Sequence, residues 1–477
     1  MSTVEPLSHQ DPDIPPEWDW AKDKENPRNW SRLQKFATAF TVCSIGFTTT
    51  VGASIYSPGH NEVKQEFNVS STVSLLPLSA YTLGLAFGPV ISSPLSEAFG
   101  RRFVYMVTLP LFDIFMLATG LTHGIASLTI CRFLAGFFAA PGVSVSAAVI
   151  CDFTSPEHRV IPLAGYYAMP WLGSAVGPLI GGFVVQAKGW RWTSWVVLMM
   201  AAAFHPPVLF LRESFKTTIL QRKNRGKVTE VSDTCNRETV SPMRMIQTFI
   251  TSTIIRPLHM LITEPLVGLI CMYTGFQFVL LYTFIVASPW VFETVYGFSL
   301  TSQSLSFLGM ISGCIFAPFV FVAVESFLRS HHPQPESSAL HNVERKLHAA
   351  LYGSFLLPFA LFWFAWSARP SVHWICPIFA QGVAFICTYL IYVACSSYMV
   401  QIYGAKYGAS ANGASSFSRY TLSAAFPLFV TQMYEALGVG WATSLLGFLA
   451  LGMAPIPWMF SRYGPAFRAR SAYEHGT

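Results

Sequence analysis

Charged residues are scarce in this sequence. Asp, Glu, Lys and Arg together make up 11% of the 477 residues, whereas about a quarter of a typical soluble domain is charged. Hydrophobic residues make up 52% of the chain, and its mean hydropathy is +0.44. This balance excludes an ordinary soluble domain and indicates a membrane protein.

The motifs of common enzyme classes are also missing. The chain has no GxxxxGK[ST] loop for ATP, no HExxH zinc motif and no GxSxG nucleophile motif. Its nine cysteines are scattered, with no CxxC pair, so we interpret them as small hydrophobic residues rather than metal ligands or disulfide partners. We therefore expect no enzymatic activity, no metal and no bound cofactor.

Alternating strands are the third absent pattern. A membrane barrel would need segments of about 10 alternating residues, whereas this chain has apolar runs of about 20 residues, enough for a helix to cross a bilayer core about 30 Å thick. Helices satisfy their own backbone groups in lipid. The pattern predicts an all-α membrane protein with about twelve spans, centred near Thr48, Gly84, Pro110, Phe138, Ser174, Ala201, Gly275, Gly313, Ala360, Phe385, Ser423 and Phe448.

The distribution of positive charge predicts the orientation. With both termini cytoplasmic, about 24 of the 30 Lys and Arg residues fall on the inner side and about 4 on the outer side. The net charge of +6 therefore reflects topology, and we expect no nucleic-acid partner. Residues 1–35 are polar and rich in proline, so we expect no secretory signal and insertion by the first helix. Asn68, in an Asn-Val-Ser sequon on a loop expected outside, is a candidate for glycosylation.

A polar insert divides the spans into two groups of six. It predicts a cytoplasmic tail at 1–35, a first six-helix half at 36–211, a flexible cytoplasmic linker at 212–263, a second half at 264–460 and a cytoplasmic tail at 461–477. Two such halves, with a site between them near the bilayer midplane, are typical of secondary transporters.

The segment SPLSEAFGRRFVYM, at 93–106, resembles the signature loop between the second and third helices of the major facilitator superfamily. The matching residues are Leu95, Glu97, Gly100, Arg101 and Arg102, whereas Ser93 and Ala98 depart from the pattern. The resemblance implies a cytoplasmic latch in which Glu97 and Asp152 pair with Arg101. The alternative is that these arginines are ordinary inner-side charges.

The fourth predicted span resembles the same family. CRFLAGFFAAPG, at 131–142, matches its R-x-x-x-G pattern and places Arg132 about two turns into the membrane. An arginine at that depth needs a cavity or a partner, and the family implies a part in proton coupling. Extension of the side chain to the outer interface is the alternative.

GSAVGPLIGG, at 173–182, contains residues that weaken soluble helices. Gly173, Gly177, Pro178, Gly181 and Gly182 fit the G-x-x-x-G-P-x-x-G-G pattern of the superfamily's antiporters. Small residues four apart let helices approach closely, and proline kinks a helix. We expect a close-packed, bendable contact between the halves and, from the resemblance, antiport. A packing motif alone is the alternative.

Most of the chain, from about Trp18 to Tyr473, resembles the fungal twelve-span branch of drug:proton antiporters. The resemblance is carried by ENPRNWS (25–31), GWRWTSW (189–195), LFWFAW (361–366), HWICPI (373–378) and AAFPLFVTQMYEALGVGWATSLLGF (424–448). It implies export of drugs, polyamines or fungal secondary metabolites in exchange for protons.

Few ionisable residues fall inside the spans. Asp113 lies about halfway across the third span and is a candidate proton carrier or a structural partner. Arg419 and Asn412 are seven residues apart on one face of the eleventh span. Arg419 is therefore a candidate for balancing an acid, contacting the cargo or joining helices.

An aromatic, polar-tipped cavity is expected between the halves. Its candidate lining residues are Tyr56, Tyr81, Tyr166, Gln277, Tyr282, Tyr392 and Asn412. Because the first span offers no acid, we favour an uncharged or anionic, partly aromatic cargo over a polycation.

These observations predict a proton-coupled antiporter that exports a small amphipathic molecule across the plasma membrane. It would act as a monomer in the lipid bilayer, with its small-molecule substrate and protons as partners. A polyamine exporter, a facilitator, an uptake symporter and a non-transporting sensor remain alternatives, and a vacuolar membrane would suit the same sequence.

Overall fold

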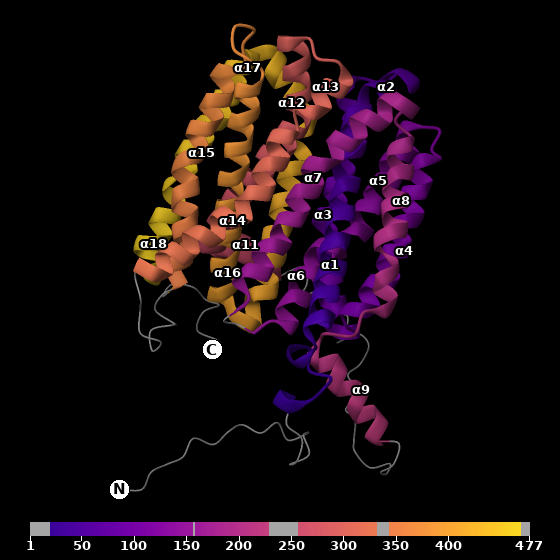
Figure 1. Cartoon of the computed structure of the whole chain (residues 1–477), viewed down its shortest axis with the longest axis vertical. Coiled ribbons are helices and arrows are strands. Elements are labelled where there is room, and N and C mark those ends of the chain that lie inside the picture. The colour runs from indigo at the N-terminus through magenta and orange to yellow at the C-terminus, as the bar shows by residue number, and fades with distance from the viewer. Residues whose placement is uncertain (1–19, 156–157, 229–255, 332–342, 469–477) are drawn as a thin grey trace.

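The protein is two groups of membrane-length helices set side by side. The computed structural model describes residues 20–155, 158–228, 256–331 and 343–468. In these ranges all regular elements are helical, and eleven helical stretches are long and apolar enough to cross a membrane. The first half is indigo to magenta in Figure 1 and the second coral to yellow. The predicted all-α membrane fold is confirmed.

The first half comprises α1 to α8. Ser31 caps the start of α1 and Gln34 completes a capping box, and Pro141 separates α5 from α6. The helices are α1 (Arg32–Ser54), α2 (His60–Glu66), α3 (Ser71–Phe99), α4 (Arg101–Gly120), α5 (Ile125–Ala139), α6 (Pro141–Phe153), α7 (Val160–Lys188) and α8 (Trp192–Phe204).

The second half comprises α12 to α18. Its central helix is α12, which is buried over nearly its whole length. The helices are α12 (Pro265–Tyr296), α13 (Leu300–Leu305), α14 (Leu308–His331), α15 (His348–Ser367), α16 (Ile375–Ala425), α17 (Pro427–Met453) and α18 (Pro455–Arg468).

The helix α16 folds back on itself. As a straight rod its 51 residues would be about 75 Å long, more than twice the bilayer core. However, a β-carbon built on Gly408 would lie 3.6 Å from the Val400 carbonyl oxygen, although eight residues rise about 12 Å along a straight helix. The chain therefore reverses between Val400 and Gly408, and α16 contains one complete span and most of the next.

A second reversal lies inside α17. Gly438 has φ 73° and ψ 162°, in the positive-φ region that glycine adopts without a steric cost. The hydroxyls of Tyr434 and Thr443, nine residues apart, consequently lie 2.9 Å from each other. The spans predicted near Phe385 and Ser423 therefore both lie on α16, and the span predicted near Phe448 lies on α17.

One end of the bundle carries short helices outside the spans. We call it the α9 end, after α9 (Lys216–Val228), and the opposite end the α2 end (Figure 1). Lys223 of α9 forms an ion pair with Asp23 of the N-terminal segment. The predicted linker at 212–263 thus contains α9 and α11 (Arg256–Thr263), and its central part, residues 229–255, lies outside the described residues.

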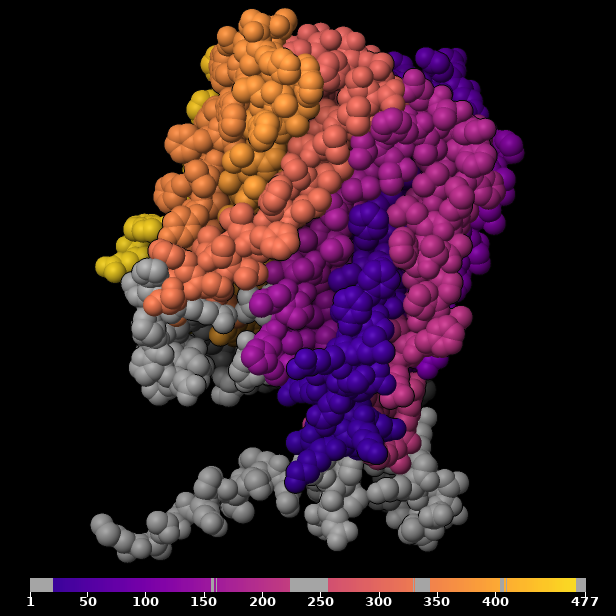
Figure 2. Space-filling model, viewed as in Figure 1, coloured from indigo at the N-terminus to yellow at the C-terminus, as the bar shows by residue number. Residues whose placement is uncertain are grey.

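The two halves are pressed together toward the α2 end (Figure 2). Ser57 donates to the Ile285 carbonyl oxygen at 3.2 Å, and Thr301 donates to Gln186. Both hydrogen bonds join the first half to the second. The α2 end is therefore closed in this conformation.

Candidate functional site

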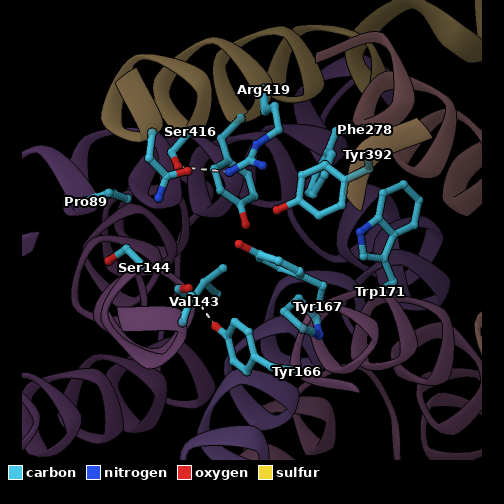
Figure 3. A pocket seen from close by; sticks show the side chains of 14 residues that line it. Pro89, Val143, Ser144, Tyr166, Tyr167, Trp171, Phe278, Tyr392, Ser416 and Arg419 are labelled. Carbon is cyan, nitrogen blue, oxygen red and sulfur yellow. Dashed lines mark hydrogen bonds between the residues drawn. The ribbon is translucent and has the colours of Figure 1, made fainter. Parts of the chain in front are cut away.

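A small cavity lies between the halves. Its volume is about 20 Å³, room for about one water molecule, and side chains surround it on all sides of Figure 3. The lining residues come from α3 (Pro89), α6 (Val143, Ser144, Ala147), α7 (Tyr166, Tyr167, Pro170, Trp171), α12 (Phe278) and α16 (Tyr392, Asn412, Ser416, Arg419, Tyr420). An organic molecule could enter only if the halves separated here.

Three of the seven predicted cavity residues line this space: Tyr166, Tyr392 and Asn412. The other four lie in the packed core instead. Tyr56 donates to the Ser74 carbonyl oxygen at 2.7 Å, Tyr81 to that of Thr49 at 2.6 Å and Gln277 to that of Tyr273 at 3.3 Å, and Tyr282 is buried. They do not line the cavity in this conformation, because helix rotation decides which side a residue faces.

Sequence reasoning missed most of an aromatic wall. Rings from both halves interlock: the centroids of Trp171 and Phe278 are 5.0 Å apart, and those of Tyr167 and Tyr392 are 5.6 Å apart. We call Tyr167, Trp171, Phe278, Tyr392 and Tyr420 the aromatic wall. The run YYAMPW, at 166–171, could have indicated an aromatic surface on α7. Which of its residues face the second half could not be predicted from the sequence of α7 alone.

Arg419 is buried, with 3% of its surface exposed. Its guanidinium carbon lies 4.9 Å from the ring centre of Tyr392 and 5.0 Å from that of Phe278, so ring faces stabilise the charge. Nη2 donates to Ser416 Oγ at 2.9 Å (Figure 3). None of the described residues lining the cavity is acidic, so Arg419 is the charged group of this site.

Arg132 is buried too, but its hydrogen bonds are committed to the backbone. Nη1 donates to the Gly52 carbonyl oxygen at 2.8 Å and Nη2 to that of Ala53 at 3.4 Å. These carbonyls belong to the last turn of α1, where cations are favourable. The guanidinium also lies 5.0 Å from the ring centres of Tyr56 and Tyr81. Arg132 therefore caps α1 and does not line the cavity.

Asp113 also lies away from the cavity. Its Oδ2 is 3.2 Å from Nδ1 of His205, which follows the end of α8, and the Phe112 ring packs against that imidazole. Asp113 thus joins α4 to α8. The geometry matches the structural alternative, and a part in proton coupling is untested.

The signature loop forms a charge cluster at the α9 end. Arg101 Nε lies 3.5 Å from Asp152 Oδ2, as the resemblance implied, and its guanidinium also contacts Ser96 and the Phe215 ring. Arg102 donates to the Leu209 carbonyl oxygen at 2.8 Å. These described contacts all lie within the first half and the segment that leaves α8.

Glu213, rather than Glu97, is the second acid of this cluster. Its carboxylate accepts backbone N–H bonds from Arg101, Arg102, Ser214 and Phe215 at 2.9 to 3.2 Å, whereas Glu97 is exposed. Three residues after Glu97 the chain turns at Gly100 (φ 99°), and the start of α4 that follows contacts Glu213. A β-carbon at Gly100 would lie 2.8 Å from the Glu213 carboxyl carbon.

The glycines of α7 pack mainly within the first half. β-carbons built on Gly173 and Gly177 would lie 2.6 Å from the Phe47 carbonyl oxygen and 2.9 Å from the Ile55 nitrogen; Gly181 also faces Ile55. Gly182 faces Ser304 of the second half, with a built β-carbon 2.7 Å from that of Ser304. Pro178 is buried among them. The motif joins α7 to α1, and its contact with the other half is limited to Gly182.

The glycosylation candidate and the described residues of metal-ligating types lie outside the cavity. Asn68 is exposed after α2, with φ 50°, so it is accessible, and its glycosylation stays a prediction. Among the described residues, no group of three or more His, Cys, Asp or Glu side chains is arranged to hold a metal ion.

Comparison with known proteins settles the family. The family model described as Major Facilitator Superfamily matches residues 42–427. The chain belongs to the major facilitator superfamily. The protein is therefore an integral membrane transporter, and its fold and relatives are those of transporters.

Relatives of this chain include fungal transporters. It is 32% identical to Polyamine transporter 4 of Saccharomyces cerevisiae over 99% of this chain and 74% of that protein, and 34% identical to Fluconazole resistance protein 1 of the same yeast over 96% and 84%. It is 33% identical to the Ascochitine biosynthesis cluster MFS transporter of Didymella fabae over 96% and 88%.

Solved structures share the fold at low identity. A crystal structure of the peptide transporter POT in complex with sulfate aligns with a TM-score of 0.63 at 15% identity, covering 91% of this chain and 95% of that one. The resemblance to the superfamily and its fungal efflux branch is confirmed.

Proposed function

We propose that this protein is a proton-coupled antiporter that exports a small amphipathic organic molecule across the plasma membrane by alternating access. The observation that carries the proposal is the cavity between the halves, which combines the aromatic wall with Arg419. Apolar rings with a few convergent polar groups are typical of sites for organic ligands.

The cavity's position suits alternating access. Tyr167 and Trp171 belong to α7 of the first half, and Tyr392 and Arg419 to α16 of the second. A tilt of one half against the other would therefore separate its walls and open it toward the α9 end, while the contacts at the α2 end keep that side closed. Relatives named for efflux and drug resistance support export as the direction.

Polyamine export is the second candidate, because one relative is a polyamine transporter. Polyamines carry several positive charges and need carboxylates for recognition. The described cavity residues include no acid and one buried arginine, and like charges repel by more in a site of low dielectric constant. We therefore favour an uncharged or anionic cargo.

The proposal can be tested in sealed vesicles with an imposed pH gradient and a fluorescent pH reporter. Hydrophobic drugs, aromatic metabolites and polyamines would be added in turn, and we expect an aromatic class to trigger proton movement. Transport of labelled cargo without proton movement would contradict antiport and indicate a facilitator.

A matched pair of variants in α7 sharpens this test. Gly177→Ala places a methyl group against Val51 and Ser54 of α1, whereas Gly165 has no heavy atom within 4 Å of a built β-carbon. We expect Gly177→Ala to lower the rate of coupled transport severalfold and Gly165→Ala to preserve it. Equal rates in the two variants would show that close packing of α7 on α1 does not matter for transport.

A further inference from the structure

Arg419 differs from Arg132, which is also buried, in what its Nη atoms contact. Nη2 bonds to Ser416 and the Tyr392 hydroxyl also interacts with the guanidinium, but Nε and Nη1 have no hydrogen-bond partner in the structure. In Arg132 both Nη atoms bond to backbone carbonyls. Arg419 therefore holds a buried positive charge and two guanidinium nitrogens, Nε and Nη1, whose N–H groups have no acceptor in the structure.

Burying a guanidinium with unpartnered donors costs free energy when no ligand is bound. A buried cation that lacks a hydrogen-bonded anionic partner loses much of its solvation energy, and unsatisfied buried donors add to that cost. Contacts with the faces of Phe278, Tyr392 and Tyr420, at 5.0, 4.9 and 5.8 Å from their centres, recover part of it. An intramembrane charge placed in this way marks a binding site.

The residues around Arg419 indicate which chemical group could accept its unpartnered hydrogen-bond donors. Arg419 and Tyr392 point into the cavity from α16, and Tyr167 points in from α7 (Figure 3). A guanidinium with two available donors matches the two oxygens of a carboxylate, and the neighbouring rings would stack on an aromatic group carried by the same molecule.

We propose that Arg419 is the substrate-recognition residue of this transporter and binds the carboxylate of an aromatic organic acid whose ring lies against the aromatic wall. Asn412 and Ser416, which lie on the same helix and line the cavity, supply further polar contacts. The inference rests on the proposed function, because it assigns the cargo class of that same cavity. It makes charge the basis of discrimination: an acid is accepted and an amine is rejected.

Three probes with one ring system test this discrimination. Radiolabelled 1-naphthoate, 1-naphthamide and 1-naphthylmethylammonium would be bound at equilibrium to the purified full chain in detergent, with non-specific retention subtracted. Since hydrogen bonds to charged groups contribute about 1.5–3 kcal/mol, we expect the acid to bind about tenfold or more tightly than the amide, and the ammonium to bind most weakly.

Variants then assign the preference to Arg419. Arg419→Gln should reduce the acid-to-amide ratio to about one while amide binding persists, which shows that the cavity is still folded. Arg419→Lys should retain part of the preference because it keeps the charge. Arg369→Gln is the matched control, since it removes a positive charge from a residue that follows α15 and packs on Trp366, and it should leave all three affinities unchanged.

Several results would overturn the inference. They are no measurable binding of naphthoate, equal binding of acid and amide by the wild type, tighter binding of the ammonium, or a preference that survives in Arg419→Gln. Binding is measured without a gradient, so it is independent of the vesicle experiment. A chain that binds naphthoate through Arg419 but moves no protons would refute antiport alone, whereas coupled transport with equal binding of acid and amide would refute this subsite alone.

Discussion

At the scale of single residues, the distinction between Arg419 and Arg132 shows how local contacts separate two buried arginines. Both are almost fully buried and both touch aromatic rings. The bonds of Arg132 end on α1 carbonyls, whereas Arg419 faces a space that a ligand could share. Their predicted depth in the membrane alone would have assigned both arginines the same function.

The acids of the signature loop give a prediction at this scale. Glu213→Ala should lower the free energy of unfolding by about 2–4 kcal/mol, because it leaves buried N–H groups of Arg101 and Arg102 without their charged acceptor. Thermal unfolding of the purified protein measures this loss. Glu97→Ala is the control and should change stability by less than about 0.5 kcal/mol, since Glu97 is exposed. A larger loss for Glu97→Ala than for Glu213→Ala would refute our assignment.

At the scale of elements, the end of α1 depends on a side chain from α5. Arg132 donates to carbonyl oxygens in the last turn of α1, which lack partners in their own helix. The rings that contact its guanidinium are Tyr81 of α3 and Tyr56 of the segment after α1. The arginine therefore fixes where α1 ends relative to its neighbours. This is a structural task that sequence motifs could not separate from proton coupling.

Arg132→Gln tests the capping assignment. We expect faster backbone hydrogen exchange around residues 52–59 and a lower melting temperature, because a buried pair of carbonyls loses a charged donor. Arg132→Lys should restore part of both, since it keeps the charge near the helix end. If stability and exchange stayed at wild-type values while proton movement in vesicles stopped, the coupling role implied by the family would be favoured instead.

At the scale of the whole molecule, the two halves meet through contacts at the α2 end, through the aromatic wall and through the buried hydrogen bond from the Tyr389 hydroxyl to the Ala164 carbonyl oxygen. Alternating access requires the α2 contacts to break once in each cycle. They are hydrogen bonds between neutral groups, each worth about 1 kcal/mol net, so they can close the α2 end without locking it.

A disulfide between the halves should arrest this cycle. In the variant Gln186→Cys with Thr301→Cys, oxidation should abolish transport in vesicles and a reductant should restore it, because the two side chains meet across the halves. The control is Glu66→Cys with Arg191→Cys, a pair that lies within the first half and should leave transport unchanged when oxidised. Continued transport by the oxidised Gln186/Thr301 variant would rule out separation at this end.

The sequence by itself determined the membrane class, the helical architecture and the superfamily. Long apolar runs and the constraint that lipid places on backbone hydrogen bonds leave few alternatives, and Arg101 and Asp152 lie together as the family resemblance implied. These features depend on local composition and on short-range spacing, which a sequence displays directly.

The tertiary structure alone decided which side chains share a cavity. Tyr81 and Tyr166 looked equivalent as polar-tipped residues, yet rotation of their helices sends one hydroxyl to the Thr49 carbonyl and the other residue to the cavity. Glu213 replaced Glu97 because a turn at Gly100 and the path after α8 brought distant segments together. Rotation, reversal and long-range contact depend on how helices pack against each other, and that information is distributed over the whole chain.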